Sequence, residues 1–275
     1  MVRDACTHKN KQPKSANHRL LANLGTQLLY ALLGGSIPAL IWLYFWLRED
    51  THPEPKRLIL KAFMGGVLAI PFALLLEALV YCGGARLFLT AAESRACGTA
   101  FPPFIAFASA FSPIAIVAFA AAEEYVKYKA AKIFVLKGKE FDEPVDAMIY
   151  LITAALGFAA FENFFFLISA FGKGVFEGLV VGNLRFLGAT LLHALSSGIV
   201  GYAIALSFYA NTRRKLYTAY GLVLATALHA VFNFTIMNEV NTSSSQDTAL
   251  FMLLLTGILL IFAFDRAKKI KQLTL

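Results

Sequence analysis

Long apolar runs, repeated along the chain between short polar breaks, constrain this sequence more than any other feature. A helix needs roughly 20 mostly apolar residues to cross the hydrocarbon core of a bilayer. Lipid offers the backbone no hydrogen-bond partner, so only helices and closed β-barrels cross it, and continuous rather than alternating apolar runs indicate helices. The sequence therefore predicts an all-α fold, a polytopic transmembrane helix bundle of about seven to eight spans.

The composition agrees with a membrane protein and excludes several other classes. Of the 275 residues, 58% are apolar and 15% are charged, whereas soluble domains carry roughly a quarter charged residues. The 25 Phe and three Cys exclude a disordered chain and a disulfide scaffold. The net charge of +8 arises from Lys and Arg in the polar breaks, with no basic stretch interleaved with aromatic residues. We therefore expect the lipid bilayer and no nucleic acid as a partner.

The apolar runs divide the chain into a basic polar N-terminal tail (1–19), a single transmembrane domain (20–265) and a basic C-terminal tail (266–275). The stretch 101–136 is ambiguous, because it contains three prolines and then two acids and several lysines. Since proline favours the first turn of a helix, we predict a span that begins near Pro113 and contains the acids. The other expected spans are 20–47, 58–82, 145–171, 184–210, 216–237 and 249–264.

Lys and Arg are concentrated in alternate breaks, and the positive-inside rule assigns those breaks to the cytoplasm. The expected localisation is a cell membrane, such as a bacterial inner membrane, with the C-terminus cytoplasmic and the N-terminus outside. The basic N-terminal tail argues against that last assignment. Cys82 and Cys97 bound an expected loop, 83–100, on the outer side, where both a disulfide and two unrelated thiols are compatible with the sequence.

Several ionisable side chains interrupt the apolar runs, and each costs roughly 2.5–3.5 kcal/mol on insertion, so each indicates function by default. Glu77 stands alone and could equally have a structural role, near an interface or paired with a lysine. Glu123 and Glu124 could cap a span, but Lys127, one helical turn on, favours a polarised site. Glu162 lies deep in an apolar run with no solvated face.

His193 and His229 occur in a repeated Leu-His-Ala tripeptide, and Asn233 follows His229 by one helical turn on the same face. A membrane histidine is often only a packing residue, but two at matching places indicate function. Counting from the adjoining turns at about 1.5 Å per residue places both histidines, Glu124 and Glu162 at similar depths. We therefore expect these groups to converge inside the bundle.

Acids and imidazoles at one depth suit attack by water on a peptide carbonyl. A glutamate held away from bulk water can accept a proton from the attacking water. We assign this role to Glu124, assisted by Glu162 or Glu123, with Lys127 keeping the acids charged.

His193 and His229, with Asn233, would stabilise the developing oxyanion in this low-dielectric setting. Glu162, His193 and His229 would serve equally as Zn²⁺ ligands with water in the open position. Since no His-Glu-x-x-His helix occurs, we favour a mechanism without a metal and leave the zinc set as the second possibility.

Other mechanisms and classes fit less well. No Gly-x-Ser-x-Gly elbow is present, and Ser196 and Ser197 can be small helix-packing residues. A proton-coupled membrane transporter is the alternative from a different class, since intramembrane acids carry protons there. Transporters usually show repeated halves with broken helices, and the Leu-His-Ala repeat is better explained by neighbouring antiparallel helices. A non-catalytic membrane scaffold is the third possibility.

Six segments in fixed order carry a resemblance. They are Thr-His-Pro-Glu-Pro-Lys (51–56), Glu-Glu-Tyr-Val-Lys (123–127), Phe-Asp-Glu-Pro-Val-Asp (141–146), Gly-Phe-Ala-Ala-Phe-Glu-Asn (157–163), His193, and His-Ala-Val-Phe-Asn (229–233). Each segment is weak by itself. Together they resemble the PrsW family of intramembrane proteases, relatives of the CAAX prenyl-protease (ABI) superfamily.

The resemblance implies an endopeptidase of about eight helices and of glutamic type, for which a metal has also been proposed. The best-known member makes the first cut in a single-pass anti-sigma factor, on the extracytoplasmic side. By position, it implies a site made of the paired acids, the second acid with Asn163 beside it, and the two histidines with Asn233. The expected function is cleavage of a peptide bond in or next to a transmembrane segment of a single-pass membrane protein.

Overall fold

The computed structural model describes residues 14–88, 113–238 and 243–270, and no strand occurs among them. The elements are α1 (Lys14–Leu47), α2 (Lys56–Phe88), α4 (Pro113–Phe134), α5 (Pro144–Lys173), α6 (Val175–Arg185), the π-helical turn η2 (Phe186–Thr190), α7 (Leu191–Leu206), α8 (Asn211–Asn238) and α9 (Ser243–Ala267). The all-α bundle predicted from the apolar runs is confirmed.

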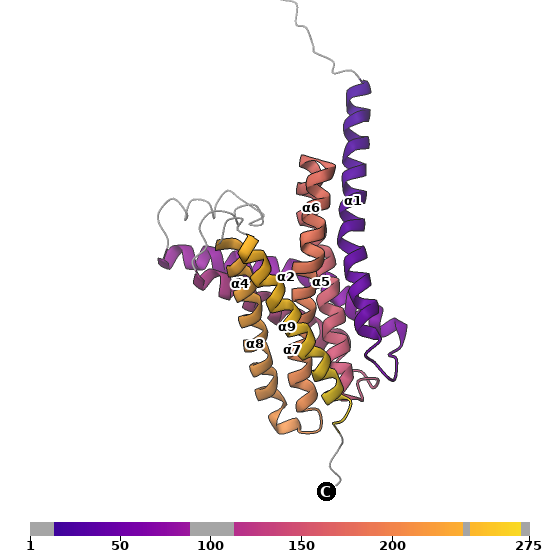
Figure 1. The fold of residues 1–275 in the computed structure, drawn as a ribbon, viewed down its shortest axis with the longest axis vertical. Helices are drawn as coiled ribbons and strands as arrows, with labels where there is room; N and C mark the ends of the chain where they lie inside the picture. The colour runs from indigo at the N-terminus through magenta and orange to yellow at the C-terminus, as the bar shows by residue number, and fades with distance from the viewer. Residues whose placement is uncertain (1–13, 89–112, 239–242, 271–275) are drawn as a thin grey trace, which may run out of the picture.

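Helix α5 is the centre of the bundle. It packs against α1, α2 and α7, and every residue from Pro144 to Ala160 is buried. A helix that is apolar on all faces has this place in a bundle, because every face must meet other apolar groups. In Figure 1, α1 and α6 extend beyond the other helices at the top, and α2 lies nearly crosswise to α5.

Most predicted spans match helices, and the differences are informative. The acids lie inside a helix that begins at Pro113, as predicted. Helix α2 continues to Phe88, so the predicted loop begins later, and Cys97 lies outside the described residues. The span predicted for 184–210 in fact covers Val175–Leu206, because a π-helical turn joins α6 and α7 into one helical segment.

Six helical segments among the described residues are long and apolar enough to cross a membrane. Helix α4 is not one of them. Its 22 residues extend about 33 Å at 1.5 Å per residue, enough for a bilayer, but it carries two glutamates and three lysines. It lies against α2, α5 and α8, so protein covers Glu123, Glu124 and Lys127, whereas Lys129 is half-buried and Lys132 is exposed.

The Pro-Glu-Pro segment and the Asp-Glu-Pro segment form one polar connection at the beginning of α5. Glu54 accepts a hydrogen bond from the Tyr150 hydroxyl, and Asp146 accepts the backbone N–H groups of Asp142 and Glu143 at 2.9 and 2.7 Å. Asp146 therefore caps α5.

Asp50 organises the other side of this connection. Its carboxylate accepts the backbone N–H groups of His52 and Glu54 at 3.0 and 3.3 Å. Burial raises the pKa of the Asp50 carboxyl, although these two N–H groups act in the opposite direction. These acids hold the α1–α2 connection against the start of α5, a structural role.

Two glycines allow α2 and α5 to cross in backbone contact. A Cβ atom on Gly66 would lie 1.8 Å from the Ala154 carbonyl oxygen, and one on Gly157 would lie 1.9 Å from the Phe63 carbonyl oxygen. Small residues at such crossings let membrane helices approach closely. The crossing fixes α5, and hence Glu162, relative to α2.

Substitution of Gly157 tests this crossing. Gly157→Val is expected to lower the free energy of unfolding by about 1–3 kcal/mol or more, because two backbones must separate. The control is Gly172→Val, since nothing lies within 4 Å of a Cβ there. Thermal unfolding of the detergent-solubilised protein measures both, and equal shifts would contradict the close approach.

Candidate active site

Charged and polar side chains from four helices meet inside the bundle. Helix α4 supplies the paired acids and a lysine, α5 a third acid, and α7 and α8 one histidine each. The residues are Glu123, Glu124, Lys127, Glu162, His193 and His229. Glu162 is half-buried and the others are buried. The depth argument from the sequence expected this convergence.

Glu124 is the most heavily bonded acid. Its Oε1 accepts hydrogen bonds from Lys127 Nζ at 2.6 Å, Ser196 Oγ at 2.9 Å and His229 Nδ1 at 2.8 Å. Ser197 Oγ lies 3.5 Å from Oε2. The side chains of Glu124 and Lys127 are fully buried. A carboxylate accepts about four hydrogen bonds, so Glu124 has little capacity left for another ligand.

Glu162 has its own cation. Arg185 Nη2, just before η2, donates to Glu162 Oε2 at 2.6 Å, and His193 Nε2 lies 3.0 Å from the same oxygen. Arg185 Nε also donates to Asn163 Oδ1, and the Asn163 amide donates to Thr190 Oγ1 at 2.8 Å. These bonds fix α5 against both sides of the π turn.

Each histidine has one nitrogen on a carboxylate and the other facing Glu123. His193 Nε2 bonds Glu162, and its Nδ1 lies 3.9 Å from Glu123 Oε2 and 3.0 Å from Lys127 Nζ. His229 Nδ1 bonds Glu124, and its Nε2 lies 3.8 Å from Glu123 Oε2. We assign the protonated nitrogen of each ring to the one that bonds a carboxylate. The carboxylates thus orient both rings.

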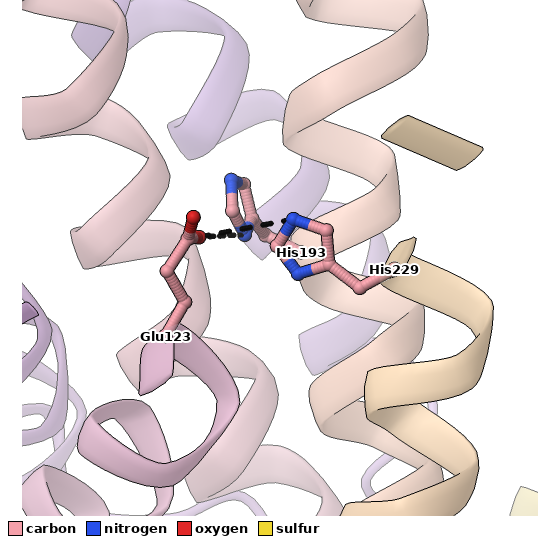
Figure 2. Close-up of side chains that lie close together, drawn as sticks. All are labelled: Glu123, His193 and His229. Carbon is pink, nitrogen blue, oxygen red and sulfur yellow. Dashed lines mark ion pairs between the residues drawn. The ribbon is translucent and has the colours of Figure 1, made fainter. Parts of the chain in front are cut away.

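Glu123 is the acid left open. Its Oε2 is buried and has no hydrogen-bond partner, although an orphaned buried oxygen is costly and uncommon. Figure 2 shows this oxygen directed at the two imidazoles. Glu123, His193 and His229 offer ligand atoms that all lie within 4.8 Å of one another. The position between them suits a water molecule or a metal ion.

The structure places the other predicted residues differently. Asn233 is half-buried on α8, and no hydrogen bond joins it to another described residue. The group that could hold a metal contains Glu123 where the sequence analysis expected Glu162. The reason is that Arg185 and His193 already occupy the Glu162 carboxylate.

Sequence reasoning missed Arg185 and undervalued two serines. The expected span began at 184, which made Arg185 a border residue, whereas the helical segment begins at Val175 and contains it. An arginine ten residues into that segment was the signal. Ser196 and Ser197, treated as packing residues, lie on α7 three and four residues after His193 and face Glu124.

Comparisons with known proteins give a consistent result. Residues 54–263 match the family described as PrsW family intramembrane metalloprotease. Protease PrsW of Geobacillus kaustophilus is 29% identical over 70% of this chain and 73% of its own length. Protease PrsW of Bacillus subtilis is 25% identical over 90% of this chain and 99% of its own. No solved structure matches the chain.

Removal of the Arg185 guanidinium tests the pairing with Glu162. Arg185→Leu is expected to lower the free energy of unfolding by about 3–5 kcal/mol, because it leaves a largely buried carboxylate without its cation. The double variant Arg185→Leu/Glu162→Leu is expected to regain much of that loss, and Arg185→Lys to lose less. Thermal unfolding in detergent measures all three. A double variant less stable than Arg185→Leu would contradict the pairing.

Proposed function

Since the chain belongs to the PrsW family and is therefore a multi-pass intramembrane protease, we propose that it hydrolyses a peptide bond in or next to a transmembrane segment of a single-pass membrane protein. An anti-sigma factor is a substrate of this class. The observation that carries the mechanism is the open Oε2 of Glu123, buried and directed at two oriented imidazoles.

Glu123 takes the role of the base. Water bound at its Oε2 lies beside His193 and His229, and Glu123 accepts a proton from it as its oxygen attacks the carbonyl carbon. The sequence analysis assigned this role to Glu124. The bonds from Lys127, Ser196 and His229 favour Glu124 as an orienting carboxylate and Glu123 as the base.

The remaining groups handle the charges that develop. The oxyanion formed on the carbonyl oxygen is stabilised by the Lys127 ammonium, whose positive charge is fully buried beside the imidazoles. The ring nitrogens that face Glu123 carry no proton in this assignment, so they accept a hydrogen bond from the attacking water. The proton held by Glu123 then passes to the amide nitrogen as the C–N bond breaks. The products are a carboxylate and an amine.

The donor set also fits a divalent metal. Glu123, His193 and His229 give one oxygen and two nitrogens, and the carboxylates of Glu124 and Glu162 orient the two imidazoles as outer partners of metal-bound histidines do. Zinc bound there would polarise the carbonyl and acidify water. In either case the carboxylates of Glu124 and Glu162 orient the imidazoles, whereas Glu123 would be a ligand of the metal instead of the base.

The proposed setting follows the charge pattern. A cell membrane with the C-terminus in the cytoplasm is expected from the distribution of Lys and Arg between the spans. The alternative of a proton-coupled transporter gains no support, because the proteins that match are proteases.

Paired substitutions separate the two neighbouring acids. Glu123→Gln is expected to abolish cleavage, by at least 100-fold, with a nearly unchanged thermal midpoint, since its Oε2 has no hydrogen bond to lose. Glu124→Gln is expected to lose stability by about 3–5 kcal/mol as well, since Lys127 keeps a buried, unpaired charge.

Membrane proteomes of cells producing each form measure cleavage, as a single-pass protein that stays uncut in the variant. Glu177→Gln, on the exposed surface of α6, is the matched control. Normal cleavage by a correctly inserted Glu123→Gln protein would refute the assigned base.

Zinc binding is a separate prediction. Addition of Zn²⁺ to chelator-treated protein is expected to raise the thermal midpoint, and the effect is expected to disappear in His193→Ala and His229→Ala. The control Glu177→Gln is expected to respond as the wild type does. Elemental analysis of the purified protein gives the stoichiometry. An equal response of wild type and histidine variants would contradict this ligand set.

A further inference from the structure

A small cavity lies beside Glu123, on the side of α2. Its volume is about 40 Å³, and carboxyl groups from three helices line it: Glu77 of α2, Glu123 of α4 and Glu162 of α5. Apolar side chains, among them Ile70, Ala73 and Phe158, form the rest of its wall. The cavity therefore has a polar portion that adjoins the open acid of the candidate active site.

Glu77 has no role in the mechanism described above and is the most unusual residue in this wall. It is 5% exposed, and no hydrogen bond or ion pair joins it to another described residue. A buried carboxyl group without a partner is costly, and water is the usual partner where protein groups do not supply one. Glu77 and Glu123 are thus two buried acids on one cavity.

The cavity is large enough for water and too small for a bulky substrate side chain. A bound water needs about 10–15 Å³ of such space and two to four polar partners, so 40 Å³ holds roughly two or three waters. The three carboxyl groups supply the partners. Arg185 already neutralises Glu162, so the cavity is polar without being strongly charged at that end.

We propose that this cavity is a water chamber that supplies the molecule consumed in hydrolysis, and that Glu77 is the residue that positions this water beside Glu123. The inference rests on the proposed hydrolysis. Each turnover adds the oxygen and one hydrogen of water to the acyl carbon and the other hydrogen to the amine, so one water must be replaced per cleaved bond. A chamber next to the base refills the site while protein and lipid surround it.

Water in the chamber can be detected without any cleavage. Hydroxyl radicals formed by X-ray radiolysis of bound water oxidise the side chains beside it, and mass spectrometry locates the labels. Ile70 is the reporter, because it is 2% exposed and lines the cavity. We expect labelling of Ile70 in the wild type, and a loss of at least fivefold in Ala73→Leu, which fills the cavity without altering an acid.

Matched variants distinguish the effect of the cavity volume from the effect of the Glu77 side chain on the bound water. Ala73→Ser keeps the volume open and is expected to retain the label on Ile70. Glu77→Leu removes the water ligand and is expected to lose the label, while Glu77→Gln still hydrogen-bonds water and is expected to retain it. Should Ala73→Leu fail to fold, the Glu77→Leu and Glu77→Gln pair decides by itself. An unlabelled Ile70 in the wild type, or equal labelling in Glu77→Leu, overturns the proposal.

Cleavage kinetics then test the positioning role. With a substrate found in the proteome comparison, Glu77→Leu is expected to lower kcat at least tenfold with little change in KM, and Glu77→Gln to restore most of it. A change in KM alone, with kcat unchanged, would overturn the positioning role. If Ile70 is not labelled in the wild type, the proposed water chamber is wrong. If no membrane protein stays uncut in the variant cells, only the proposed hydrolysis is wrong.

Discussion

The fully buried ion pair between Glu124 and Lys127 is the interaction on which the rest of the site depends. Removing two charges from water costs several kcal/mol each, and the cost is offset only when further hydrogen bonds complete the pair. Here α7 supplies Ser196 and His193, and α8 supplies His229. The pair therefore stabilises one arrangement of three helices and disfavours others that would leave a charge uncovered.

A second network, around Glu162, joins α5 to the π turn, and the two networks meet at His193. That ring accepts from Lys127 at one nitrogen and bonds Glu162 at the other. Glu123 lies between the networks and shares a hydrogen bond with neither, which leaves its Oε2 without a hydrogen-bond partner. The hydrogen-bonded acids hold the helices together, and the acid with an unbonded oxygen is the one that we propose as the base, so neighbouring glutamates in one sequence motif have different surroundings.

The helical fold and the meeting of the charged groups could be predicted from the sequence. Apolar runs require helices, Pro113 indicated where α4 begins, and the depth of each charge indicated that the groups would converge. The choice of base that we propose among the acids needed the structure, because it depends on which carboxylate oxygens the serines and Lys127 occupy in three dimensions. Arg185 was missed because the predicted span began at residue 184, nine residues after the observed segment begins at Val175. A π turn leaves no clear signal in the apolar pattern. The role of Glu54 needed the contact with Tyr150, which lies 96 residues away.

The charged character of α4 has a consequence for how the chain enters the bilayer. As an isolated segment, α4 is too polar to partition into lipid, since each central charge costs roughly 2.5–3.5 kcal/mol. The groups that cover those charges lie on α7 and α8, which leave the ribosome later. The insertion machinery must therefore retain α4, or leave it outside the lipid, until more than 100 further residues have been synthesised (His229 is 105 residues beyond Glu124). Assembly of the candidate active site and membrane integration of α4 are in this sense a single late event.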